Sequence, residues 1–300
     1  MNARFTGLLL AGALSLAAPG AFAAQTIERS IDTTHDGEVR VRNVAGQVTI
    51  RGWDEARVEL RVELSSDDQR VDIDDTPGRI AIDVREPEDR GRTRSRSATV
   101  TLSVPHGSRV DVSGVSANID VGGVYGELSL QSVSGDLRVE GFGGELRARS
   151  VSGDQRLNGR GERGRVQLAS VSGDVHLRGA RGDLELSLVS GNADLGDGEF
   201  ERVRINAVSG DVRGRLRLTP DGRFDGETVS GGLHIEFTDP LDGRFELQSF
   251  SGSIDDCNGH AAERTSRYAP GRRLSFERGD GTAVVRARTM SGAISICDVR

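Results

Sequence analysis

Apolar residues recur at positions two apart on both sides of a short motif, Val-Ser-Gly-Asp, along most of this chain. Complete copies of the motif begin at Val133, Val151, Val171 and Val208. Copies that keep only an apolar residue, a serine and a glycine begin at Val189, Val229, Phe250 and Met290. A spacing of two is the period of a β-strand, and none of the repeated units shows a helical period. The pattern therefore predicts an all-β chain.

The motif glycines recur every 18 to 21 residues from Gly135 to Gly252, and Gly292 follows after 40. A fixed period near twenty residues is typical of stacked-repeat proteins, in which each unit needs its neighbours to bury its apolar face. We therefore expect a β-solenoid, similar to a β-helix, built of 18–21-residue coils with Val-Ser-Gly-Asp corners.

Five apolar positions in each coil are expected to point inward. They lie seven, five and two residues before the motif glycine, and two and four residues after it. The step of three before the motif changes the strand parity, which predicts a corner or bulge, and glycine beyond it suits a positive φ or a close backbone approach. In this interpretation Val171 is buried, and Val171→Asp would break the stack.

Residues 1–23 have the features of a secretory signal peptide. Arg4 provides a positive start, residues 8–18 are mostly apolar, and an Ala-Phe-Ala sequence predicts cleavage between Ala23 and Ala24. A membrane anchor is the alternative, but the apolar run is short and a Pro-Gly pair interrupts it. The expected mature protein is exported to the periplasm or the cell surface and has no further membrane span.

The mature chain divides into two parts by pattern. Residues 24–105 predict an irregular N-terminal β part of the same body, in which 38–51 already fits the coil template; a separate small β-domain is the alternative. Residues 106–300 predict the solenoid, with an insertion at 258–281 that bulges from the stack. The charged stretch 85–97 is interpreted as a solvated loop rather than a basic patch for an anionic partner, because its acids offset its arginines.

The two cysteines, Cys257 and Cys297, each lie five residues after a motif glycine. If 258–281 bulges outward, their coils become neighbours and the two sulfurs stack within reach of each other. An exported protein meets an oxidising compartment, so a structural disulfide is favoured. A metal pair or a redox pair is the alternative, but the spacing is not CxxC and no histidines accompany the cysteines.

Two polar ladders accompany the motif. The acids that follow the glycines could hold Ca²⁺ or act as the carboxylates of a carbohydrate-active enzyme, but turn chemistry explains them more simply. They are Asp136, Asp154, Asp174 and Asp211. The serines that precede the glycines cannot all be nucleophiles, and we expect them to bond backbone groups at the corners.

No metal or cofactor motif is present in the sequence. His176 and His234 share a coil position but are expected three coils apart, about 14 Å, which is too far for one metal ion. The formal net charge of -7 makes a nucleic-acid partner improbable. Exposed aromatic platforms for sugars would have to come from Trp53, Tyr125 and Tyr268, since aromatic residues are 4% of the chain. We expect no catalytic residues, metal or cofactor.

The corners, the run Leu102–Pro105 before Val110–Val112, and residues 279–292 resemble the DUF4097 family of bacterial β-strand-repeat proteins. The resemblance covers about residues 38–299. It implies an envelope β-solenoid, in a family whose adhesin label is inferred from the repeats, and it supplies no catalytic set.

These observations favour a non-catalytic exported scaffold of the cell envelope, with a role in adhesion or envelope stress. Its partner would be an envelope protein or polymer. The alternative is a carbohydrate-active β-helix enzyme or a polysaccharide-binding protein, which a cleft lined by acids and aromatic residues outside the repeat would favour. A third hypothesis is a regulatory partner of a membrane protein.

Overall fold

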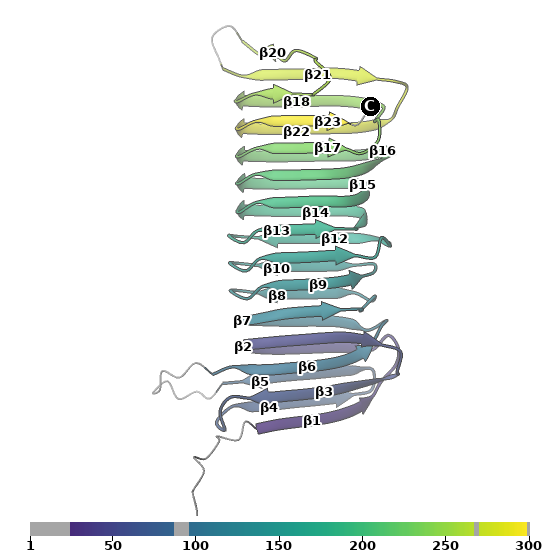
Figure 1. Ribbon diagram of the computed structural model, residues 1–300, viewed down its shortest axis with the longest axis vertical. Helices are drawn as coiled ribbons and strands as arrows, with labels where there is room; N and C mark the ends of the chain where they lie inside the picture. The colour runs from purple at the N-terminus through teal and green to yellow at the C-terminus, as the bar shows by residue number, and fades with distance from the viewer. Residues whose placement is uncertain (1–24, 87–95, 267–269, 299–300) are drawn as a thin grey trace, which may run out of the picture.

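The computed structural model describes residues 25–86, 96–266 and 270–298. Its strands join one 23-stranded sheet with parallel and antiparallel pairs, wound into a tall stack with β1 at the bottom and β20 and β21 at the top (Figure 1). The all-β class is thereby confirmed. The expected signal peptide and its cleavage site at Ala23 and Ala24 lie outside the described residues, as does most of the charged stretch, at 87–95.

The strands in the lower half of the stack are β1 (Gln25–Asp32), β2 (Glu38–Trp53), β3 (Arg57–Leu64), β4 (Arg70–Thr76), β5 (Arg79–Arg85), β6 (Ala98–Pro105), β7 (Arg109–Gly122), β8 (Leu128–Ser132), β9 (Leu137–Phe142), β10 (Leu146–Ser150) and β11 (Gln155–Gly159). Those in the upper half are β12 (Arg163–Ser170), β13 (Val175–Arg178), β14 (Arg181–Ser190), β15 (Ala193–Ser209), β16 (Val212–Ser230), β17 (Leu233–Phe237), β18 (Gly243–Ser251), β19 (Ile254–Asp255), β20 (Glu263–Arg264), β21 (Arg272–Arg278), β22 (Ala283–Ser291) and β23 (Ile294–Asp298).

Each repeat contributes one layer with two arms, joined at the motif. In the middle of the stack, β8, β10, β12 and β14 pair in parallel on one side of the corners. On the other side β9, β11, β13 and β15 pair in parallel in the same order. Equivalent residues of successive layers therefore lie one strand spacing apart, about 4.8 Å. The corners follow the left edge of the stack in Figure 1.

The N-terminal strands continue the same sheet. β2 pairs in parallel with β7 on one side and with both β5 and β6 on the other, so the layer of residues 38–53 lies inside the stack. Beyond it, β3 pairs antiparallel with β6, β4 with β5, and β1 with β3. Antiparallel strands thus cover the lower end of the stack.

The C-terminal strands correct one expectation from the sequence. Within the expected insertion at 258–281, the described strand β21 does not bulge outward but pairs antiparallel with β18 and extends the sheet at its upper end. The final layer, β22 and β23, lies between the layer of β16 and β17 and the layer of β18 and β19. The last layer in sequence is therefore an internal layer in space, and the chain covers its own upper end before it returns.

The core differs from the predicted inward pattern at one position. In the first full layer Leu128, Leu130, Leu137 and Val139 are buried as expected, but Val133 is 42% exposed. The inward alternation continues instead to Ser132, three residues before the glycine, which is 4% exposed. The assignment of the motif valine to the core was therefore wrong, and this includes Val171, which is 40% exposed.

A candidate binding groove along the corners

The motif valines and their counterparts form one exposed stripe, which we call the apolar ladder. Every large hydrophobic side chain that is exposed among the described residues belongs to it. In their order along the stack its members are Val44, Val115, Val133, Val151, Val171, Val189, Val208, Val229, Met290 and Phe250. Ten rungs at the strand spacing extend over about 43 Å. Such a contiguous apolar surface marks an interaction site more often than scattered exposed residues do.

In several layers the residue before the motif valine is a serine that closes the corner from the inside. The Ser132 hydroxyl accepts a hydrogen bond from Gly135 N (2.8 Å), and Ser170 Oγ does the same for Gly173 N (3.0 Å). Each bond closes the corner from inside, so the two residues between serine and glycine turn outward. The expected corner hydrogen bonds of the motif serines come instead from this serine, two positions earlier in the chain.

The motif glycine is required because successive layers nearly touch at the corner. A Cβ atom on Gly153 would lie 2.0 Å from the carbonyl oxygen of Gly135, and one on Gly173 would lie 2.1 Å from that of Gly153. Gly191 has a φ of 123° as well, which side chains rarely adopt. Glycine thus keeps the corners stacked at the strand spacing, and this brings the ladder side chains into contact range.

The acids that follow the glycines bond the neighbouring layer. Asp136 Oδ1 accepts a hydrogen bond from Asp154 N (3.0 Å), and Asp154 Oδ1 accepts one from Asp174 N (3.1 Å). The series continues through Asn192, whose side-chain oxygen accepts a bond from Asp211 N (3.1 Å). Because asparagine serves in the same place, the position needs an acceptor oxygen rather than a charge. The acids therefore bond backbone groups, but those of the next layer, so the expectation that each acid bonds the backbone of its own turn was wrong.

The last acid of this series, Asp211, has a lowered pKa. The hydrogen bond from Gly232 N to Asp211 Oδ1 (2.8 Å) holds the pKa of Asp211 below its ordinary value, and Arg213 adds to the effect. Among the described residues, no group of three or more His, Cys, Asp or Glu side chains could hold a metal ion. His176 and His234 lie three layers apart, with Asp194 and Arg213 between them, as the spacing predicted.

A groove runs beside the apolar ladder, with a volume of about 1250 Å³. One wall is the part of the ladder from Val133 to Phe250. The opposite wall, the rim, consists of the residues four before each glycine: Ser113, Gln131, Arg149, Ala169, Ser187, Asn206, Glu227, Arg288 and Gln248. The floor consists of the residues three before it: Gly114, Ser132, Ser150, Ser170, Leu188, Ala207, Thr228, Thr289 and Ser249. The volume exceeds the roughly 300–1,000 Å³ usual for small-molecule sites, which suits an elongated occupant.

The groove changes character along its length. In the middle layers the floor is apolar, at Leu188 and Ala207, and these are the places where other layers have serine or threonine. At the upper end, Arg272 lines the groove from β21, in register with Ser249 of β18. The groove therefore joins an apolar middle to a cationic upper end.

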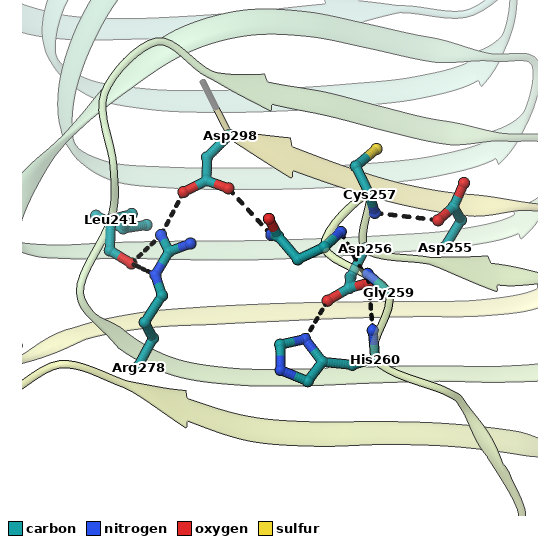
Figure 2. Close-up of polar contacts among 9 residues, drawn as sticks. Leu241, Asp255, Asp256, Cys257, Gly259, His260, Arg278 and Asp298 are labelled. Atoms are coloured by element: carbon teal, nitrogen blue, oxygen red, sulfur yellow. Dashed lines mark hydrogen bonds and ion pairs between the residues drawn. The ribbon is translucent and has the colours of Figure 1, made fainter. Parts of the chain in front are cut away.

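The disulfide and a polar cluster fix this upper end. Cys257 and Cys297 form a disulfide, with Cα atoms 5.2 Å apart, because β19 and β23 are paired neighbours. Figure 2 shows the polar contacts next to it. Asp256 is 2% exposed, and its carboxylate accepts hydrogen bonds from three backbone N–H groups, at 258–260. Its second oxygen bonds His260 Nδ1.

A second contact in Figure 2 ties the chain end to the connection before β18. Arg278 forms an ion pair with Asp298, and its Nε also donates to Leu241 O (3.0 Å). Burial alone would raise the pKa of Asp298, but the hydrogen bonds from Arg278 and Asn258 lower it below the ordinary value. The cluster is a set of internal contacts that hold β18, β21 and β23 together.

The two described aromatic residues that could have served as sugar platforms are engaged in local packing. Tyr125 stacks on His106 with ring centroids 4.7 Å apart, and Arg160 covers it at 3.8 Å. Trp53 donates its indole N–H to Arg57 O (2.9 Å). Tyr268 lies outside the described residues. Sequence reasoning missed the groove itself, although the apolar residue beside a Ser-Gly corner was a signal that could have been interpreted as exposed.

Comparison with known proteins adds a family and a fold. The profile of the Toastrack DUF4097 family matches residues 38–297. A solved structure from Parabacteroides distasonis, described as a "putative lipid binding protein", is 12% identical with a TM-score of 0.52, and the match covers 92% of this chain and 97% of that one. One from Parabacteroides merdae, described as a "putative adhesin", is 11% identical with a TM-score of 0.51, covering 94% and 98%. The search of curated proteins gave no match.

Proposed function

The chain belongs to the Toastrack DUF4097 family, and we propose that it acts as a non-catalytic binding scaffold of the cell envelope. In this proposal the stack is a β-solenoid, which holds the apolar ladder rigid and straight. The observation that carries the proposal is that all the exposed large hydrophobic side chains of the described residues gather in this one stripe beside a groove. A rigid row of this kind suits the binding of an elongated apolar segment of an envelope molecule.

Export is part of the proposal. The disulfide Cys257–Cys297 suits an oxidising compartment, and the first residues of the sequence have signal-peptide features. The described residues contain no helix that could cross a membrane. The two fold neighbours carry descriptions of binding proteins, an adhesin and a lipid binding protein. At 11–12% identity they bear on the fold alone, so the proposal depends on the ladder.

The carbohydrate alternative finds less support in the groove. Among the described residues that line it, Glu227 is the one acid and Phe250 the one aromatic residue. Glu227 also pairs with Arg288 at 3.3 Å. A glycosidase needs two carboxylates across the scissile bond, and sugar platforms need exposed aromatic rings, so an apolar occupant fits this surface better.

A comparative capture experiment tests the proposal. The mature protein and a Val171→Asp/Val208→Asp variant would be cross-linked in envelope extract, and the bound molecules identified by mass spectrometry. The proposal expects at least one envelope component that the wild-type protein enriches and the variant does not. If the variant retains every captured component, the ladder is not the binding surface; a captured glycan would favour the alternative.

A further inference from the structure

The upper end of the groove contains an arginine and two hydroxyls that no described residue binds; Arg149, on the rim of a lower layer, is likewise unpaired among the described residues. Arg272 is exposed, and within the described part of the chain its guanidinium has no hydrogen bond or ion pair. The floor hydroxyls beside it, Ser249 Oγ and Thr289 Oγ1, are shielded from solvent and also lack a partner. In contrast, Ser170 and Ser132 in lower layers bond the corner glycines. The end of the groove therefore offers one free cation and two unused hydroxyls.

We propose that this groove binds a long-chain fatty acid, with its carboxylate on Arg272 and its acyl chain along the apolar ladder. This inference rests on the proposed function and names the occupant of the same groove. A guanidinium binds a carboxylate with two parallel hydrogen bonds, which are charge-assisted and therefore strong.

The length of the groove fits one acyl chain. In register along the floor, Arg272 is followed by Ser249, Thr289, Thr228, Ala207 and Leu188. Five strand spacings correspond to about 24 Å. One leaflet of a bilayer core, which an acyl chain spans, is about 15 Å. The chain is therefore accommodated in full; it ends near Thr228, three spacings or about 14 Å from Arg272, before the floor becomes apolar at Ala207.

The ladder and the rim, which flank the proposed acyl chain, also suit a fatty acid. Beside the head-group end the ladder carries its largest side chains, Phe250 and Met290, which are 58% and 59% exposed. The rim acid in this part, Glu227, is paired with Arg288, so it does not oppose an anion with a free charge. A methylene chain needs no register with the rungs, whereas the side chains of an extended peptide, about 7 Å apart on one face, would not match rungs about 4.8 Å apart.

The test compares two probes that differ only in the head group. Binding of hexadecanoate, below its critical micelle concentration, and of hexadecanol would be measured by equilibrium dialysis with the mature protein. We expect hexadecanoate to bind at least tenfold more tightly, since a hydrogen-bonded ion pair is lost with the alcohol. Arg272→Gln should remove this preference, and Arg273→Gln on the same strand should retain it.

A substitution in the ladder wall tests binding of the acyl chain independently of binding of the carboxylate. Val229 is 50% exposed, so Val229→Asp should fold with an unchanged melting temperature and weaken both probes more than tenfold. Equal binding of the two probes would overturn the carboxylate site while leaving an apolar groove in place. Absence of hexadecanoate binding, in a protein whose ladder still captures an envelope component, would overturn this inference alone.

Discussion

At each corner, a single residue decides whether a side chain joins the core or the groove. The residue three before the glycine, a serine or threonine in most layers and Leu188 or Ala207 in two, is buried, and the apolar residue next to it is exposed. This inverts the usual preference of the two residue types. The hydroxyl can stay inside because it bonds the corner backbone, as Ser170 does at both Gly173 N and Gly173 O. The exposed apolar residue then faces solvent instead of the core.

The first prediction concerns Val171, which is 40% exposed, and Leu168, which is 2% exposed in the same arm. Val171→Asp should change the free energy of unfolding by no more than about 0.5 kcal/mol, as is usual at the surface. Leu168→Asp buries an unpaired carboxyl group and should cost several times more. Thermal melts of the two variants check this. Equal losses of stability would indicate that Val171 is buried in the core.

The second prediction concerns the glycine contact. Gly153→Ala places a methyl group 2.0 Å from Gly135 O, so one layer must move, and we expect a loss of at least about 2 kcal/mol. Gly144→Ala is the matched control, because nothing lies within 4 Å of its Cβ position. Chemical denaturation of both variants measures the difference. A Gly153→Ala protein as stable as the control would mean that the corners are not packed this closely.

At the scale of the strands, the corner acids connect one layer to the next. Their side chains accept backbone N–H groups across the spacing between layers, in a series that begins at Asn118 and reaches Gly232. Backbone donors at a corner would otherwise remain without an acceptor. The carboxylates thus have a structural task, and this explains their recurrence without a catalytic role.

The third prediction follows from the lowered pKa of Asp211. A carboxyl group with a lower pKa in the folded than in the unfolded chain stabilises the fold above its unfolded pKa, and this contribution disappears as pH falls through the folded pKa. The melting temperature should therefore decrease between mildly acidic pH and about pH 3. Asp211→Asn keeps the acceptor oxygen and should reduce this slope. Asp211→Ala should lower stability at neutral pH by about 1 kcal/mol.

An unchanged slope in the asparagine variant would show that Asp211 does not contribute to the acid sensitivity.

Particular residues show how far the sequence could predict these elements. The strict alternation at 57–64 gave β3 with its bounds, and the template fit at 38–51 became β2 (Glu38–Trp53). The predicted inward or outward direction of side chains was wrong at the corner, because the apolar motif residue, which lies between two polar residues, was assigned to the core. The corner instead turns the motif residue outward in every layer, including those with Leu188 or Ala207, and the sequence does not distinguish a buried serine such as Ser132 from an exposed one.

At the scale of the whole molecule, both ends of the stack are covered by antiparallel strands. β1, β3 and β4 cover the lower end, and β21 covers the upper end. Exposed edges of a parallel stack would invite pairing with other chains, so such strands reduce association. The order of the upper layers could not be predicted, because every layer fits the same template and can pair with any other.

The fourth prediction concerns the disulfide, which joins cysteines 40 residues apart. Its removal in a Cys257→Ser/Cys297→Ser variant should cost up to about 4 kcal/mol in the chain-entropy description. Hydrogen exchange should become faster in β19 and β23 and stay unchanged in β9 and β11, several layers away. Unchanged exchange in β23 would show that the Arg278–Asp298 contact suffices to hold the chain end.

The most direct test of the account is site-specific photo-cross-linking in envelope extract. A photoreactive residue would replace Val208 on the ladder or, as a control, His176, which is 42% exposed on the other arm of its layer. The account predicts a cross-linked envelope component from position 208 and none from 176. Equal products from both positions, or products from 176 alone, would contradict the assignment of the apolar ladder as the binding surface.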